Sequence, residues 1–209
     1  MAELSGERAF PERNETGRVE AFSDGVLAIV ITLLVLELHV PRDLTSEAAL
    51  RAALAHEWPA YFAFLTSFAT VGIMWVNHHR LFTLIGRVDH WLLMLNLLLL
   101  LTICIVPFPT AIVAEYLGSD GARTATLVLG GTFVFIAIVF NVLWRYASQD
   151  RRMIAPHVPQ EVVDAQTRQY RLGPVFYLAS FLLAIVSPLL SVGVNLAMAI
   201  FFALPLKLK

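Results

Sequence analysis

Apolar residues occur along this chain in long blocks that short polar segments separate. The blocks cover residues 18–38, 58–76, 90–106, 124–144 and 172–206. A helix needs about 20 mainly apolar residues to cross a hydrocarbon core of about 30 Å. Helices and closed barrels are the structures that span membranes, and continuous apolar blocks indicate helices. We therefore expect an all-α integral membrane protein, with one transmembrane helix in each of the first four blocks.

The last apolar block, 172–206, is too long for a single crossing. As one helix it would measure roughly 52 Å at about 1.5 Å per residue. Ser187 and Pro188 lie near its middle, and proline interrupts helical hydrogen bonding. The block therefore predicts two shorter helices, 172–187 and 189–206. With them the chain has six transmembrane helices in one domain that covers residues 1–209.

The connections between the apolar blocks differ in character. Residues 44–55 have apolar positions at helical spacing after a Thr-Ser-Glu start, which predicts a short interfacial helix. The PFPT segment at 107–110 should kink or end the third helix. Residues 147–171 form the longest soluble connection. Residues 1–17 are polar and charged without an apolar core, so they are expected to be a polar lead rather than a cleaved signal.

Composition narrows the possible functions. Hydrophobic residues make up 58% of the 209 residues and charged residues only 15%, whereas soluble domains have roughly 25% charged residues. The net charge of −1 gives no indication of nucleic-acid binding. The single cysteine, Cys104, allows neither a disulfide framework nor a cysteine metal site within one chain.

Basic residues predict how the chain is oriented in the membrane. Cytoplasmic loops carry an excess of lysine and arginine. In the six-helix topology, one side receives Arg8, Arg13, Arg18, Arg80, Arg87, Arg145, Arg151, Arg152, Arg168, Arg171, Lys207 and Lys209. The other side receives only Arg42, Arg51 and Arg123. We therefore predict a multi-pass protein of the cell membrane with both termini in the cytoplasm.

The first apolar block has polar residues in a distinctive arrangement. At 100° per residue, Thr32 shares one helix face with Ile29, Leu33 and Leu36, whereas Asp24 points about 140° away from Ile29. This face could pack against protein or lipid, with Thr32 bonding back to its own helix. Alternatively, copies of the face could surround an axis and form hydrophobic constrictions in an ion pathway. Periodicity alone does not decide between these two hypotheses.

Ionisable residues near the start of the first helix form a second candidate site. A charge near a membrane helix interior is costly unless it is paired or hydrated. Asp24 has His78, His79 and Asp89 as candidate partners on the same side of the membrane. We expect these residues to form a structural network that fixes helix packing. The alternatives are a membrane-embedded metal-dependent enzyme or a proton-coupled carrier, although adjacent histidines on a helix diverge by about 100°.

The beginning of the first block carries a recognisable motif. It reads R-x-x-x-F-S-D, formed by Arg18, Phe22, Ser23 and Asp24, and it continues as GVLAIVITLLVLEL. This motif resembles the signature of the transmembrane protein 175 family of potassium channels, in its bacterial single-repeat form. The MWVNHHRLF segment at 74–82 and the PFPT segment at 107–110 are also similar to that family.

The resemblance implies a potassium-selective passive channel rather than an enzyme. Such a protein is a homotetramer with a pore lined by the first helix of each subunit, and it needs no cofactor and no structural metal beside the permeant potassium ions. Ile29, Leu33 and Leu36 would then form hydrophobic rings that gate the pore, and Thr32 would contribute to ion selectivity. The implied structural network contains Arg18, Phe22, Ser23, Asp24, His78, His79 and Asp89.

Overall fold

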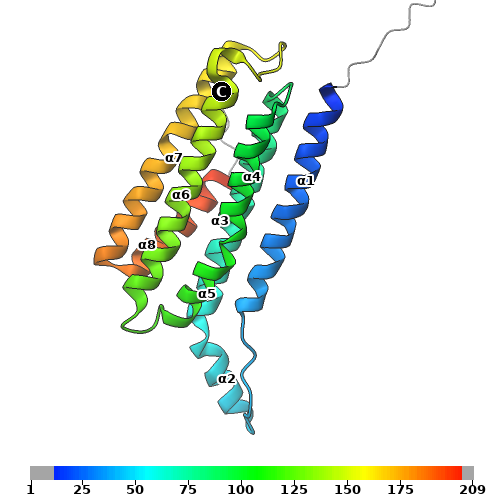
Figure 1. Ribbon diagram of the computed structural model, residues 1–209. Coiled ribbons are helices and arrows are strands. Elements are labelled where there is room, and N and C mark those ends of the chain that lie inside the picture. The colour runs from blue at the N-terminus through cyan, green and yellow to red at the C-terminus, as the bar shows by residue number, and fades with distance from the viewer. Residues whose placement is uncertain (1–11, 204–209) are drawn as a thin grey trace, which may run out of the picture.

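The chain folds as an all-helical bundle (Figure 1). The computed structural model describes the backbone of residues 12–203 and the side chains of residues 15–200. In chain order the helices are α1 (Glu12–Leu33), the 3-10 segment η1 (Leu34–Glu37), α2 (Glu47–His56), α3 (Trp58–Leu84), α4 (His90–Cys104), α5 (Pro107–Tyr116), α6 (Ala122–Ser148), the 3-10 segment η2 (Gln149–Arg151), α7 (Gln160–Val186) and α8 (Pro188–Ala203).

The long helices run alternately up and down the bundle. Five stretches are long and apolar enough to cross a membrane, namely 15–37, 58–84, 90–116, 122–151 and 160–186. The apolar helix α8 is shorter, with 16 residues. The first turns of α1 and the connections after α3 and α6 lie at one end, here called the upper end, and α2 lies at the lower end (Figure 1). An antiparallel bridge between Ile85 and Ile154 joins the two upper connections.

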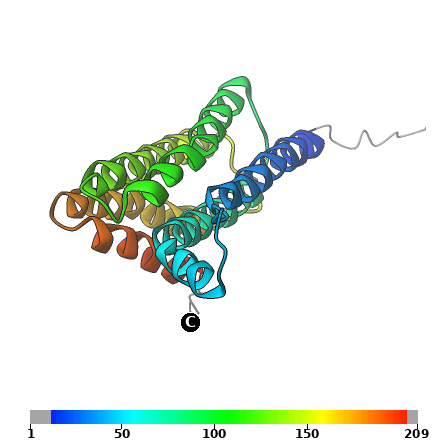
Figure 2. The ribbon, with the colours of Figure 1, turned by 90° about the horizontal axis from the view of Figure 1, so that it is seen from below.

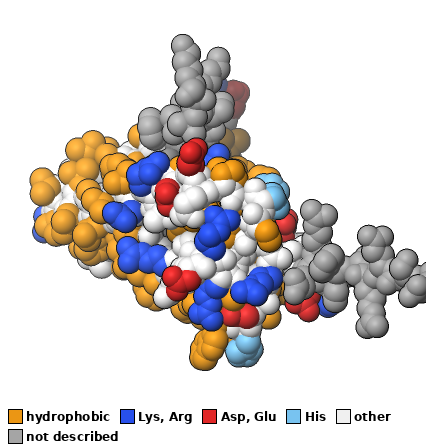
Figure 3. All heavy atoms as spheres, turned by 90° about the horizontal axis from the view of Figure 1, so that it is seen from above, with side chains coloured by type: hydrophobic (Ala, Val, Ile, Leu, Met, Phe, Trp, Pro, Cys, Tyr) orange, Lys and Arg blue, Asp and Glu red, His pale blue; other side chains and the backbone are white. Residues whose placement is uncertain are grey.

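Arginine side chains gather in the upper half of the bundle (Figure 3). The described ones there are Arg18, Arg80, Arg87, Arg145, Arg151, Arg152, Arg168 and Arg171, whereas Arg42, Arg51 and Arg123 belong to the lower half. Arg8, Lys207, Lys209 and the side chain of Arg13 lie outside the described residues. The alternation of the described helices therefore produces a strong difference in basic residues between the two ends.

Three helices extend beyond the bounds expected from hydropathy. α1 begins at Glu12, so residues 12–17 of the expected polar lead are helical. α3 continues past residue 76 to Leu84, because Leu81 and Phe82 keep one of its faces buried. α7 begins at Gln160 rather than near residue 172. Its first turns are charged on the outside and bury a narrow inner face, so their average hydropathy is too low to indicate a helix.

The helix breaks have local causes. α4 ends at Cys104, and α5 starts with Pro107, as the PFPT segment predicts. Proline suits the first helical position because its missing N–H has no intrahelical acceptor there. Ser187 separates α7 from α8 directly before Pro188, which is the break expected in the last apolar block. By contrast, the first helix does not remain α-helical to residue 38, since its last turn tightens into η1.

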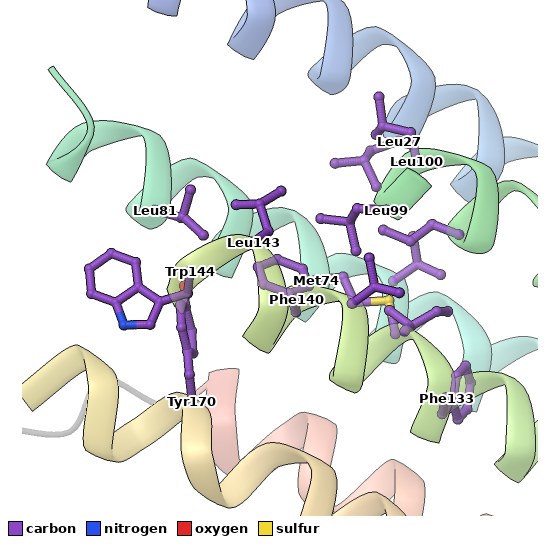
Figure 4. Packing of buried hydrophobic residues seen from close by; sticks show 14 of the residues in the cluster. Leu27, Met74, Leu81, Leu99, Leu100, Phe133, Phe140, Leu143, Trp144 and Tyr170 are labelled. Atoms are coloured by element: carbon purple, nitrogen blue, oxygen red, sulfur yellow. The ribbon is translucent and has the colours of Figure 1, made fainter. Parts of the chain in front are cut away.

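Buried aliphatic and aromatic side chains join most of the helices into one core. Leu27 of α1 meets Leu99 and Leu100 of α4 (Figure 4). Trp144 and Tyr170 join α6 to α7, with their rings 5.6 Å apart and nearly perpendicular. α1 lies at the edge of this bundle and packs mainly against α3 and α4 (Figure 2). The other helices therefore form a scaffold on which α1 is mounted.

Paired hydroxyl groups hold the helices together within the apolar interior. Ser67 of α3 lies 2.7 Å from Thr110 of α5. Ser191 of α8 donates to the carbonyl oxygen of Ser180 in α7 at 2.8 Å. In membrane helices such hydroxyls allow close approach and form interhelical hydrogen bonds, each contributing about 0.6 kcal/mol on average. These pairs fix α5 and α8 against their neighbours.

The junction of the two upper connections generates a prediction at Gly86. Its N–H donates to the Met153 carbonyl oxygen at 2.8 Å, and a Cβ on residue 86 would lie 2.8 Å from the Ala155 Cα. The Gly86→Ala variant should lose about 1–3 kcal/mol of stability, because backbone atoms must move apart. Thermal unfolding of the purified variant measures this loss. Gly72→Ala is the matched control, since its Cβ meets nothing within 4 Å, and equal unfolding temperatures for the two variants would contradict the prediction.

Candidate functional site

Helix α1 has one buried face and one exposed face. Ser23, Leu27, Val30 and Leu34 recur at spacings of three and four residues, and each is at most 2% exposed. This spacing places them on one side of the helix, where α1 packs against α3 and α4 and the start of η1 packs against α3 and α5. The opposite side of α1 is not covered by any described part of the chain, and it is the side on which the sequence places the candidate pore residues.

The exposed face of α1 is mostly aliphatic. Ile29 is 60% exposed, Leu33 is 42% exposed and Leu36 is 69% exposed. Thr32 is also exposed. The structure therefore brings these four predicted residues together on one surface that lies along the helix.

The 3-10 segment η1 changes the geometry of this face. Residues three apart eclipse one another in a 3-10 helix, so Leu36 lies on the same side as Leu33. A regular α-helix turns by 100° per residue and would leave Leu33 and Leu36 about 60° apart around the axis. This spacing does not apply beyond Leu33, because η1 is a 3-10 segment. Ile29, Leu33 and Leu36 are then spaced at steps of about 6 Å along the axis, from rises of about 1.5 Å and 2.0 Å per residue. Three separate aliphatic levels result.

The hydroxyl group of Thr32 has a defined orientation. Its Oγ1 donates to the Ile29 carbonyl oxygen at 2.8 Å. Because the hydroxyl hydrogen is used within the helix, the oxygen lone pairs remain available on the exposed face. A cation beside Thr32 can therefore be coordinated by the hydroxyl oxygen without breaking this bond.

A buried chain of hydrogen bonds links α3, α4 and α1. His78 Nε2 lies 2.9 Å from Asn96 Oδ1, so this nitrogen carries the hydrogen and donates. Asn96 Nδ2 donates to Ser23 Oγ at 3.0 Å, and Ser23 Oγ donates to the Val19 carbonyl oxygen at 2.8 Å. His78 and Ser23 are fully buried and Asn96 is 2% exposed. The sequence analysis missed Asn96, although an asparagine in a leucine-rich block is a visible signal.

Two further contacts tie α1 to α3. Trp75 Nε1 donates to Asp24 Oδ1 at 3.0 Å. His79 Nδ1 lies 2.6 Å from Glu20 Oε1 and forms an ion pair when it is protonated. The rings of Trp75 and His79 stack, with centroids 6.4 Å apart. Asp24 therefore contacts α3 instead of pointing along the exposed aliphatic face, and Trp75 is a partner that sequence reasoning did not identify.

Asp89 is separate from the two histidines. Its carboxylate accepts from the Leu92 N–H at 2.8 Å and from the Tyr146 hydroxyl at 2.6 Å. Desolvation by burial raises the pKa of Asp89, but these hydrogen bonds and the charge of Arg152 outweigh it and leave the pKa below its ordinary value. The ionised carboxylate caps the start of α4 and links it to α6.

Arg18 and Phe22 line an open groove between α1 and α4, and Asp89 belongs to the opposite wall. Phe22 is 57% exposed. The predicted network is thus divided into three parts: the buried chain around Ser23 and His78, the exposed contacts of Asp24 and His79, and the Asp89 cap beside the groove. No group of three or more His, Cys, Asp or Glu residues with metal-binding geometry occurs within the described residues.

Comparisons with known proteins identify relatives of this chain. The family described as "Endosomal/lysosomal potassium channel TMEM175" matches residues 18–107. A protein of Chamaesiphon minutus, named as a potassium channel, is 53% identical over 195 residues, covering 93% of this chain and 96% of that protein. A potassium channel of Streptomyces collinus is 41% identical over 190 residues, covering 90% of this chain and 92% of that protein.

A solved structure has the same fold. It is the crystal structure of a lysosomal potassium-selective channel TMEM175 homolog from Chamaesiphon minutus, which superposes with a TM-score of 0.82 at 53% identity. The match covers 91% of this chain and 97% of that one. The sequence and structure comparisons both agree with the resemblance that the motif at Arg18, Phe22, Ser23 and Asp24 indicates. The chain therefore belongs to the TMEM175 family of ion channels.

Proposed function

We propose that this chain forms a homotetrameric, potassium-selective passive channel, with one α1 helix from each subunit around the pore. The observation that carries the proposal is the aliphatic face of α1, which no described part of the chain covers. The opposite side of α1 is packed against the rest of the bundle. Aliphatic side chains suit lipid as well as a pore, and the relatives, which are named potassium channels, favour the pore. Membership of a channel family removes the case for a membrane-embedded enzyme.

In this tetramer Ile29, Leu33 and Leu36 form three successive hydrophobic rings. An ion that passes a narrow aliphatic ring must lose hydration, and widening that admits water lowers this barrier. Four Thr32 oxygens lie between the first two rings and replace part of the lost hydration shell. The rings therefore act as the gate, and the threonine ring contributes to selectivity.

The basic upper end belongs at the cytoplasmic side of the cell membrane. The excess of arginines in the upper half supports this orientation through the positive-inside rule. Helix α8 completes a sixth crossing in the proposal, which places both termini on the cytoplasmic side. Its short length is compatible with local thinning of the bilayer.

The polar contacts at the upper part of α1 serve to hold the pore helix. Ser23, Asp24 and Glu20 are each bound directly or through Asn96 to α3 residues. Arg18 and Phe22 line the groove beside these contacts and are available to a neighbouring subunit. In this account Asp24 does not bind the permeating ion.

Replacing the side chains of one hydrophobic ring by shorter ones should open the gate. We expect Leu33→Ala or Ile29→Ala to raise potassium flux into liposomes by about tenfold, equivalent to about 1.4 kcal/mol less barrier. Leu182→Ala is the matched control, because Leu182 is 51% exposed on α7, on the opposite side of the bundle from α1 (Figure 2). Flux that stays at the wild-type level in both ring variants, with intact tetramers, is incompatible with a hydrophobic gate at these positions.

Removing the hydroxyl of Thr32 should reduce selectivity. We expect Thr32→Ala to lower the preference for potassium over sodium by about fivefold, because a hydrogen bond or ion contact of about 1 kcal/mol is lost at each passage. Thr32→Ser keeps the oxygen and should retain the preference. Reversal potentials under mixed potassium and sodium gradients measure this ratio, and an unchanged ratio in the alanine variant would exclude a selectivity role for Thr32.

The two adjacent histidines should differ in their effect on stability. His78→Phe should cost about 1–3 kcal/mol, because it leaves the buried Asn96 carbonyl oxygen without a donor. His79→Phe should cost at most about 1 kcal/mol, since its ion pair with Glu20 is exposed. Thermal unfolding and tetramer content by size-exclusion chromatography with light scattering measure both variants. A larger loss for His79→Phe would refute the assignment of His78 to the anchoring chain.

A further inference from the structure

A cavity of about 70 Å³ lies between α3, α6 and α7. A water molecule needs about 10–15 Å³ of such volume, so the cavity has room for several water-sized or methylene-sized groups. It is partly open to the surface, and α6 and α7 lie on the opposite side of the bundle from α1 (Figure 2). The proposed pore therefore does not account for this cavity.

The cavity lies beside an irregular part of α7. Gly173 lines it, and a Cβ at this position would meet nothing within 4 Å. The next residue, Pro174, has no N–H, so the Tyr170 carbonyl oxygen loses its intrahelical donor. Asn141 of α6 replaces this donor with its Nδ2, which also donates to the Ala137 carbonyl oxygen at 3.3 Å. The glycine and proline therefore leave space beside α7, and the Asn141 amide is held at its edge.

Polar groups with unused hydrogen-bonding capacity line this cavity. The side-chain amides of Asn77 and Gln169 and the Tyr177 hydroxyl form no hydrogen bond with any residue in the described ranges. Because Asn141 donates to two carbonyl oxygens, its Oδ1 remains as an acceptor. Unpaired polar groups are costly where little water is present. The cavity therefore favours an occupant with a group that both donates and accepts, such as a hydroxyl.

The rest of the cavity wall is apolar and uncharged. Ile73 and Met74 of α3 and Ile136 and Phe140 of α6 belong to it. None of the described residues that line the cavity is an acid, a lysine, an arginine or a histidine, and tyrosine is neutral at pH 7. A charged group would lose hydration here without gaining a counterion, which is unfavourable. The lining therefore selects a neutral ligand with an aliphatic part.

We propose that this cavity binds a neutral amphiphile that has one hydroxyl group and one aliphatic chain. The hydroxyl group bonds to the free Asn77 amide, and the chain lies against Ile73, Ile136 and Phe140. Asn77 follows Ile73 by one helical turn, so the polar and apolar parts of the ligand have separate partners along one face of α3. Ligand pockets commonly combine apolar walls with a few polar groups in this way.

The experiment uses the purified full-length protein in phosphatidylcholine nanodiscs. The probe is a photoreactive diazirine derivative of 1-octanol, and mass spectrometry identifies the labelled residues. Labelling is expected at cavity residues such as Phe140 and Tyr177, and excess 1-octanol should suppress it. Octyl sulfate and octyltrimethylammonium, which are permanently charged, should not suppress it at the same concentration. Equal competition by a charged compound, or labelling only at lipid-facing residues such as Leu182, would overturn the proposal.

Filling the cavity provides a second test. Gly173→Leu introduces a side chain where a Cβ has free space, and it should reduce labelling of the cavity residues about tenfold. Gly72→Leu is the matched control, because a Cβ there also meets nothing within 4 Å and Gly72 does not line the cavity. Its labelling should equal that of the wild type. Equal labelling of the two variants, with thermal unfolding showing that both are folded, would overturn the site.

A third variant tests recognition of the hydroxyl group. Asn77→Leu should raise the 1-octanol concentration needed for half-maximal competition about fivefold, because one hydrogen bond is lost. Octane has no hydroxyl group, so it should compete equally well in the wild type and in this variant. Unchanged competition by 1-octanol, or an equal loss of competition by octane, would show that Asn77 does not bind a hydroxyl group.

Discussion

The attachment of α1 to the rest of the bundle is the constraint on which the proposed channel depends. α1 packs along one side only, so its position is set by few contacts. The buried hydrogen bond from Asn96 Nδ2 to Ser23 Oγ has a fixed direction, and Asn96 Nδ2 would be unsatisfied if α1 turned or slid. His78 on α3 holds the Asn96 side chain in place for this bond. In an interior with little water an unpaired polar group is costly, so this chain specifies one rotation of α1. That rotation decides which residues remain uncovered.

Two solvent-exposed side-chain contacts between α1 and α3 also favour this orientation of α1. Asp24 contacts Trp75 and Glu20 contacts His79, so both residues tie α1 to α3. These contacts lie at the surface, beside the buried hydrogen bonds. Polar and apolar residues are separated along the length of α1. Polar contacts are concentrated near the upper end, whereas residues 25–36, which include Ile29, Leu33 and Leu36, carry no charge and Glu37 is the next charged residue.

Much of the fold follows from the sequence, because long apolar blocks and proline positions mark helices and breaks. The starts of α1 and α7 and the end of α3 were not predicted. Residues 12–17 contain no apolar block, and the start of α7 and the end of α3 are polar outside and bury only a narrow face. The four residues of the exposed face were predicted by helical spacing, but the 3-10 turn that aligns Leu33 with Leu36 has no clear sequence signal. Asn96 and Trp75 were missed because their importance arises from partners distant in the chain. The oligomeric state is a property of several chains, and the pattern within one chain does not determine it.

The central claim, that the uncovered face of α1 lines a potassium pathway, can be tested directly by cysteine modification. Cys104 is the single cysteine of the chain, so a Cys104→Ser background allows one new thiol at a time. A charged, water-soluble thiol reagent should block potassium flux through liposomes containing Leu36→Cys. It should leave flux through Leu182→Cys unchanged, because Leu182 is exposed on α7, away from α1. Flux through Leu36→Cys that persists after complete modification, or equal block of both variants, would contradict the account.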